Sequence, residues 1–129
     1  MKKKKAILCV DDEPIILASL KMELTQTFGN EFIIETAESG EEALEVIDSL
    51  VGDDVQTLVI ISDWLMPNMK GDELLTQVHL KFPKMIKIML SGQADQKAIS
   101  RVEKEIKAAF MAKPWKGQDL STFIKKQLL

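Results

Sequence analysis

The sequence predicts an α/β fold in which a parallel five-stranded sheet is covered by helices on both faces. Short apolar runs that suit buried strands alternate five times with segments of helical periodicity along the 129 residues. The strand-like runs are apolar at nearly every position, as expected where both faces of a strand are covered. Right-handed crossovers between parallel strands then place helices on both sides of the sheet.

The first unit is a strand over residues 5–10, followed by a helix from about Pro14. The fixed φ of proline suits a first helical turn. Gly29 and Asn30 should end the helix, and a second strand is expected over residues 32–35. Helical spacing predicts that the helix buries Ile15, Ile16, Leu20 and Leu24.

Ser39 marks the start of the second helix, because Glu42 follows three residues later in a capping-box pattern. Gly52 should close this segment, and the third strand is expected over residues 57–62. The buried stripe of the helix comprises Ala43, Leu44, Ile47 and Leu50.

Gly71 precedes the third helix, which stops before Pro83. Strands are expected over residues 86–90 and 108–112, and Asp95 can cap the helix between them. The last helix should run over about 118–126. The apolar positions of these three helices are Leu74, Leu75, Val78 and Phe82, then Ile99, Val102 and Ile106, then Leu120, Phe123 and Ile124.

Length and composition favour a single globular domain, residues 1–129, that either stands alone or was excised from a longer chain. The chain is 46% apolar and 29% charged, and its net charge of −3 gives no reason to expect direct nucleic-acid binding. Cys9 is expected to be a small buried hydrophobe, and His79 a surface residue. No stretch approaches the roughly 20 apolar residues of a membrane span, and no signal peptide follows Met1, so we expect a cytoplasmic protein.

Chemically active side chains follow four of the five predicted strands. Asp11 and Asp12 follow the first strand, Asp63 the third, Ser91 the fourth and Lys113 the fifth. Ligands of open parallel sheets bind at the carboxyl ends of the strands. We therefore expect these side chains to meet in one site.

The chemistry of this set points to phosphoryl transfer. Carboxylates about 4 Å apart repel by a few kcal/mol at an effective dielectric near 20, so the three acids need a cation. Mg²⁺ prefers oxygen ligands and leaves positions for phosphate. The Lys113 ammonium and the Ser91 hydroxyl would complete a cradle for a phosphoryl group, with Asp63 as the nucleophile.

Four segments, DDE (11–13), DWLMP (63–67), SG (91–92) and KPW (113–115), resemble the motifs of the receiver domain of two-component response regulators. The resemblance covers nearly the whole chain and keeps the order of the motifs. It implies a flavodoxin-like (βα)5 three-layer sandwich with the strand order 2-1-3-4-5. It also implies a cis peptide bond before Pro114, which is frequent in this family.

The resemblance assigns roles residue by residue. Asp63 is the phosphoacceptor, and Lys113 pairs with the phosphate. Ser91 and Phe110 are the switch residues, which move inward on activation. The Mg²⁺ ligands would be Asp12, Asp11 through a bound water, Asp63 and the backbone carbonyl of Leu65.

The implied function is signal transduction by a switch rather than catalysis by a turnover enzyme. A histidine kinase or phosphotransfer protein would phosphorylate Asp63, and an output domain or downstream protein would read the change at the fourth helix, fifth strand and fifth helix. Phosphorylation-dependent homodimerisation is a further expectation. The segments SGQAD (91–95) and KPW are similar to those of receivers in multidomain regulators with enzymatic outputs.

Two features depart from common receivers. Ser91 stands where threonine is more frequent, and the segment EKEIKAAF (103–110) lacks the usual glycine before the fifth strand. Apolar Leu65, two residues after the acceptor, is expected to slow hydrolysis of the phosphate.

Three alternatives remain open at this point. A degenerate receiver would be a phosphorylation-independent interaction module, which the intact acids, Ser91 and Lys113 argue against. An aspartyl phosphatase would usually carry a second aspartate at position 65, where this chain has Leu65. A flavin protein would share the fold, but the acids would repel the cofactor phosphate.

Overall fold

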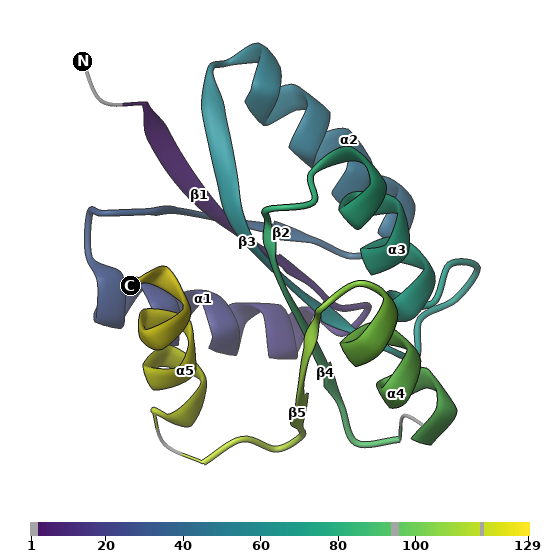
Figure 1. Cartoon of the computed structure of the whole chain (residues 1–129). Helices are drawn as coiled ribbons and strands as arrows, with labels where there is room; N and C mark the ends of the chain where they lie inside the picture. The colour runs from purple at the N-terminus through teal and green to yellow at the C-terminus, as the bar shows by residue number, and fades with distance from the viewer. Residues whose placement is uncertain (1–2, 94–95, 117) are drawn as a thin grey trace.

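A parallel five-stranded sheet with the order β2-β1-β3-β4-β5 forms the centre of the fold (Figure 1). The computed structural model describes residues 3–93, 96–116 and 118–129. Its elements are β1 Lys4–Val10, α1 Pro14–Phe28, β2 Ile33–Ala37, α2 Gly40–Gly52, β3 Val55–Asp63, α3 Gly71–Lys81, β4 Ile86–Ser91, α4 Gln96–Glu105, β5 Ala109–Ala112 and α5 Asp119–Leu128. The predicted fold class and strand order are confirmed.

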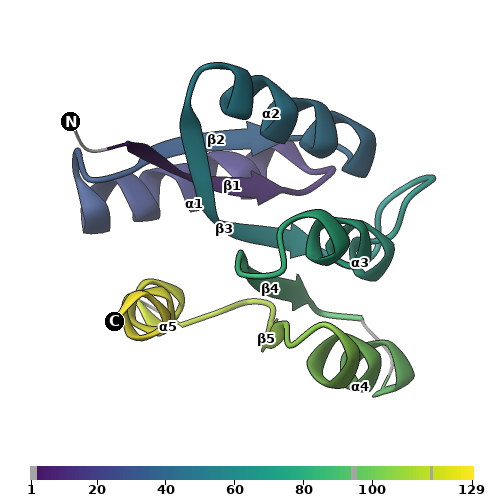
Figure 2. The ribbon, with the colours of Figure 1, turned by 45° about the horizontal axis from the view of Figure 1, so that its top comes forward.

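The helices form two layers around the sheet (Figure 2). Helices α1 and α5 cover one face, and α2, α3 and α4 cover the other. The central strand β3 is buried between them: Val59 and Ile61 face the α1–α5 layer, Ile60 faces the opposite layer, and all three are fully buried. This burial gives Asp63, the last residue of β3, a rigid support.

Helix α1 begins at Pro14 as predicted, and the predicted Leu20 and Leu24 are buried, but the buried face does not include Ile15. Ile15 is 82% exposed, so the prediction that it is buried is wrong. The buried stripe comprises Leu17, Leu20, Leu24 and Phe28, whose spacing of three and four residues follows one helical face. Gly29 ends the helix with φ +57°, and its N–H donates to the carbonyl of Thr25 at 2.8 Å.

The predicted start of α2 is confirmed, because the Ser39 side chain accepts a hydrogen bond from the Glu42 N–H at 3.1 Å. Its end differs from the prediction: Gly52 is still helical, and the left-handed residue is Asp54 with φ +60°. Strand β3 begins two residues earlier than predicted, at Val55. Asp95, the predicted cap of α4, lies outside the described residues.

The connection between α4 and β5 is made without glycine because Lys107 adopts the left-handed conformation, with φ +54°. The N–H of Ala108 then donates to the Val102 carbonyl at 2.8 Å, which closes the helix end. Ile106 is buried as predicted, although it follows α4 rather than belonging to it. A residue with a side chain thus occupies a backbone position that usually favours glycine.

Two of the remaining predictions concern single buried groups. Cys9 is fully buried, and burial raises the pKa of its thiol to about 12, so it is an inert core residue. His79 is half-buried rather than a plain surface residue, and its buried Nδ1 has no hydrogen-bond partner in the described part of the chain. No helix among the described residues is long and apolar enough to span a membrane.

Candidate functional site

The register of the sheet brings the predicted site residues to one edge. Along the paired strands, Val10 lies opposite Ser62, Asp63 opposite Leu90, and Ser91 opposite Ala112. Asp11 follows β1 directly, and Lys113 follows β5 directly. The carboxyl ends of four neighbouring strands therefore supply Asp11, Asp63, Ser91 and Lys113 at the same level of the sheet.

Three carboxylates cluster at this edge. Asp11, Asp12 and Asp63 each offer an oxygen atom, and these atoms lie within 4.8 Å of one another. Asp11 and Asp63 are buried, whereas Asp12 is exposed. The backbone N–H of Glu13 donates to Oδ1 of Asp11 at 2.9 Å and fixes that carboxylate. An all-oxygen set with one solvent-facing member fits Mg²⁺, which keeps part of its water shell when bound.

Lys113 bridges two of these acids. Its Nζ donates to Oδ2 of Asp11 at 2.7 Å and to Oδ1 of Asp63 at 3.1 Å. Burial lowers the pKa of the Lys113 ammonium, but the hydrogen bonds and negative charges of Asp11 and Asp63 outweigh burial, so the pKa lies above its usual value. The lysine is therefore a fixed positive charge beside Asp63.

The surroundings of the Asp63 carboxyl disfavour its charged form. Burial raises its pKa, the hydrogen bond from Lys113 lowers it, and the charge of Asp11 raises it again, so that the pKa lies above its usual value. One ammonium does not compensate the negative charge of the cluster. The donor set and this excess of negative charge together fit a divalent cation.

Ser91 and Leu65 line a cavity of about 570 Å³ together with Asp12, Asp63 and Lys113. Ser91 is buried; its Oγ accepts a hydrogen bond from the Gln93 N–H at 3.0 Å. Leu65 is 47% exposed at the rim. The use of its backbone carbonyl as a metal ligand stays a prediction.

Phe110, the other predicted switch residue, is half-buried on β5 and packs against the core layer of α2, α3 and α4. Its movement stays a prediction. The peptide bond between Lys113 and Pro114 is cis, as the resemblance implied.

A hydrogen-bond network beside Asp63 was missed by sequence reasoning. The Nε1–H of Trp64 donates to Oδ1 of Asp72 at 3.2 Å, and Nη1 of Arg101 in α4 donates to Oδ2 of the same carboxylate at 2.9 Å. No local sequence pattern indicates this pairing, because Asp72 and Arg101 are far apart in the chain.

Comparison with known proteins identifies the family. The family model described as the response regulator receiver domain matches residues 7–125. The chain is a response regulator receiver domain. Receiver domains belong to two-component systems, in which they act with histidine kinases and output domains, so the predicted family and its general function are confirmed.

Relatives of this receiver occur both as small proteins and as parts of large ones. The two-component response regulator ORR11 of Oryza sativa is 31% identical over 124 residues, which cover 95% of this chain and 80% of ORR11. The sensor kinase CckA of Brucella abortus is 30% identical over 122 residues, and the match spans 95% of this chain but only 12% of CckA.

A solved structure has the same fold. The signal receiver domain of an HD domain-containing protein from Pseudomonas fluorescens Pf-5 superposes with a TM-score of 0.83 at 26% identity, covering 99% of this chain and 88% of that one.

Proposed function

We propose that this receiver accepts a phosphoryl group on Asp63, in the presence of Mg²⁺, and thereby switches the output of a two-component pathway. One observation carries the proposal. The Asp63 carboxylate ends the central strand in a cavity, with the Asp11 and Asp12 oxygens within 4.8 Å and the Lys113 ammonium at 3.1 Å. A nucleophile, a metal-binding acid pair and a phosphate-binding cation thus share one pocket.

Asp11, Asp12, Asp63 and the Leu65 carbonyl would hold Mg²⁺, which neutralises charge on the phosphoryl oxygens and on the cluster. An Asp63 carboxylate oxygen attacks the phosphorus of a phosphohistidine. The phosphorus–nitrogen bond breaks, its electron pair returns to the imidazole, and an aspartyl phosphate forms. Lys113 donates to a phosphoryl oxygen and holds the group in line, which is most of what such a transfer requires of the protein.

The switch would use Ser91 and Phe110. Ser91 directly follows Leu90, the residue that lies opposite Asp63 in the sheet. Rotation of the Ser91 hydroxyl toward the phosphate would break the hydrogen bond that it accepts from the Gln93 N–H. Phe110, packed at the edge of the core, would then turn inward. Such a change shifts a population between two packings of one fold.

The partners follow from this role. We propose a histidine kinase or phosphotransfer protein as donor, and an output domain or downstream protein, or a second copy of the receiver, at the surface of α4, β5 and α5. Residues 1–129 would form one receiver domain, alone or within a longer regulator, acting in the cytoplasm as a switch rather than as a turnover enzyme.

The test is phosphorylation by phosphoramidate, a small-molecule donor, with intact mass as the readout. Wild type should gain the mass of one phosphoryl group only with Mg²⁺, and Asp63→Asn should gain none. Equal gain by Asp63→Asn, or no gain by wild type, would contradict the proposal. Beryllofluoride with Mg²⁺ gives a second readout: unchanged amide NMR spectra would favour a phosphorylation-independent interaction module instead.

A further inference from the structure

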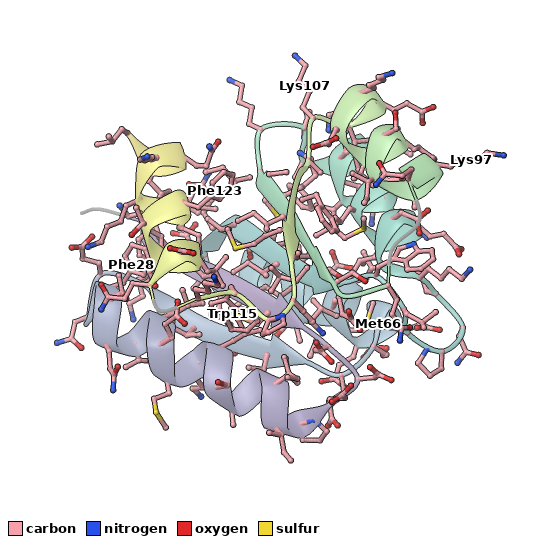
Figure 3. All side chains as sticks on the ribbon, turned by 90° about the horizontal axis from the view of Figure 1, so that it is seen from below. Phe28, Met66, Lys97, Lys107, Trp115 and Phe123 are labelled. Carbon is pink, nitrogen blue, oxygen red and sulfur yellow. The ribbon has the colours of Figure 1, made fainter. Side chains whose placement is uncertain are left out.

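Glu23 of α1 joins the segment that follows β5 to helix α5. The Nε1–H of Trp115 donates to Oε1 of Glu23 at 2.7 Å, and the Ser121 hydroxyl donates to Oε2 at 2.9 Å. The hydroxyl of Thr27, one turn further along α1, donates to Ser121 Oγ at 2.9 Å. In Figure 3 the labelled Trp115 lies between the start of α5 and α1.

The charge of Glu23 strengthens this junction. Within the described residues no lysine or arginine forms an ion pair with Glu23, so its two oxygens are held by the Trp115 and Ser121 donors. Hydrogen bonds to an ionised carboxylate are shorter and about twice as strong as neutral ones. A half-buried carboxylate that receives both donors fixes the indole of Trp115 relative to α1.

The indole leads directly to the functional site, because Trp115 lies two residues after Lys113. On its other side Lys113 is held by β4, since its N–H donates to the Ser91 carbonyl at 3.1 Å. The indole also packs against the core of the α1–α5 layer and lines a groove of about 410 Å³ with Ile16 and Pro114. The segment 113–115 therefore has two anchors, β4 and Glu23.

We propose that Glu23 is a positioning residue for Lys113. Through Trp115 it sets the path of segment 113–115 and so the place from which the Lys113 ammonium reaches Asp63 and an incoming phosphoryl group. This role rests on the proposed phosphorylation of Asp63. Ser121 binds the other oxygen of Glu23 but belongs to α5, so its bond supports α1–α5 packing without holding Lys113.

The matched pair Trp115→Phe and Ser121→Ala separates positioning from stability. Each variant removes one hydrogen bond to Glu23, so both should lose stability in urea unfolding. At saturating phosphoramidate and Mg²⁺, Trp115→Phe should be phosphorylated about tenfold more slowly, because small misplacements of reacting groups reduce rates strongly. Ser121→Ala should stay within about twofold of wild type, since Lys113 keeps its place.

A second pair tests Glu23 itself. Glu23→Ala should reproduce the slow phosphorylation of Trp115→Phe, and Glu23→Gln should recover part of the rate, because its amide oxygen can accept from the indole. Equal rates for Trp115→Phe and Ser121→Ala would overturn the role. If wild type itself is not phosphorylated, the proposed function fails, and crystal structures of wild type and Trp115→Phe then test the positioning role. That role is overturned if Trp115→Phe keeps Lys113 Nζ at 3.1 Å from Asp63 Oδ1.

Discussion

Gly71 is a position where a single methyl group would disturb the proposed phosphorylation site directly. It is the first residue of α3, and its N–H donates to the Trp64 carbonyl at 2.8 Å. A Cβ at this position would lie 2.0 Å from the Asp63 carbonyl oxygen and 2.9 Å from both the Asp63 carbonyl carbon and Trp64 Cα. All three neighbours are backbone atoms, so no side-chain rotation relieves the clash.

The size of the disturbance follows from these distances. Real Cβ contacts essentially never fall below 3.0 Å, so Gly71→Ala must separate α3 from the end of β3 by about 1 Å. Forced overpacking of this kind costs about 1–3 kcal/mol of stability. Asp63 Oδ1 lies 3.1 Å from Lys113 Nζ, so a displacement of about 1 Å at the end of β3 would break this hydrogen bond. A 1 Å misplacement can slow a reaction by about 100-fold.

The assay compares Gly71→Ala with Gly52→Ala, a matched control. Gly52 is the last residue of α2 and has no atom within 4 Å of an added Cβ, so its replacement should leave stability unchanged or raise it by up to about 1 kcal/mol. Urea unfolding gives the stability, and phosphoramidate with Mg²⁺ gives the rate. Wild-type stability together with a wild-type rate in Gly71→Ala would refute the steric reasoning.

Four further outcomes are expected. Lys107→Gly should stabilise the protein by about 0.5–1 kcal/mol in urea unfolding, because glycine adopts φ +54° without a Cβ penalty; a loss of stability would contradict this. Asp72→Ala should destabilise by about 1–2 kcal/mol, since the Trp64 and Arg101 donors lose their acceptor; unchanged stability would show that the network contributes nothing. The pKa of Asp63 is raised above 3.8, so the native state binds its proton more tightly than the unfolded chain, and this group makes stability fall as pH rises from 3.8 through the raised pKa. Without Mg²⁺ at neutral pH, Asp63→Asn should therefore be more stable than wild type, and an equal pH slope for both proteins would refute the assignment. Leu65→Asn should lose its phosphate faster, as followed by intact mass over time; an unchanged or slower loss would count against shielding by Leu65.

The strands and the main site residues were predictable because each depends on a local pattern. A run such as LVII (58–61) is apolar enough to predict a covered strand, and Asp63, two positions after the run, is then expected at the end of that strand, at the sheet edge. Asp11, Asp63 and Lys113 follow this pattern, and the parallel register of the strands brings them to the same edge of the sheet. Their convergence therefore needs no knowledge of individual contacts.

The errors have a different origin. The exposure of Ile15 depends on how α1 is rotated against the sheet. The helix packs against the sheet with the apolar stripe of Leu17, Leu20 and Leu24, which leaves Ile15 outside the buried face. The hydrogen bond between Trp115 and Glu23 joins residues 92 positions apart, and no sequence pattern around either residue predicts the contact. The close approach of Gly71 to Asp63 likewise appears only in three dimensions.

The net charge of the site relates the three carboxylates to the Lys113 ammonium. Three carboxylates and one ammonium leave two net negative charges at a site where Asp11 and Asp63 are buried. Burial raises the pKa of Asp63 most, and the charge of Asp11 raises it further. One divalent cation cancels the two net negative charges. Lys113 spans Asp11 and Asp63, so a cation that took over those oxygens would free the ammonium for the phosphoryl group of the proposed reaction. In the proposed function, metal binding and readiness for phosphoryl transfer would thus be coupled through Lys113.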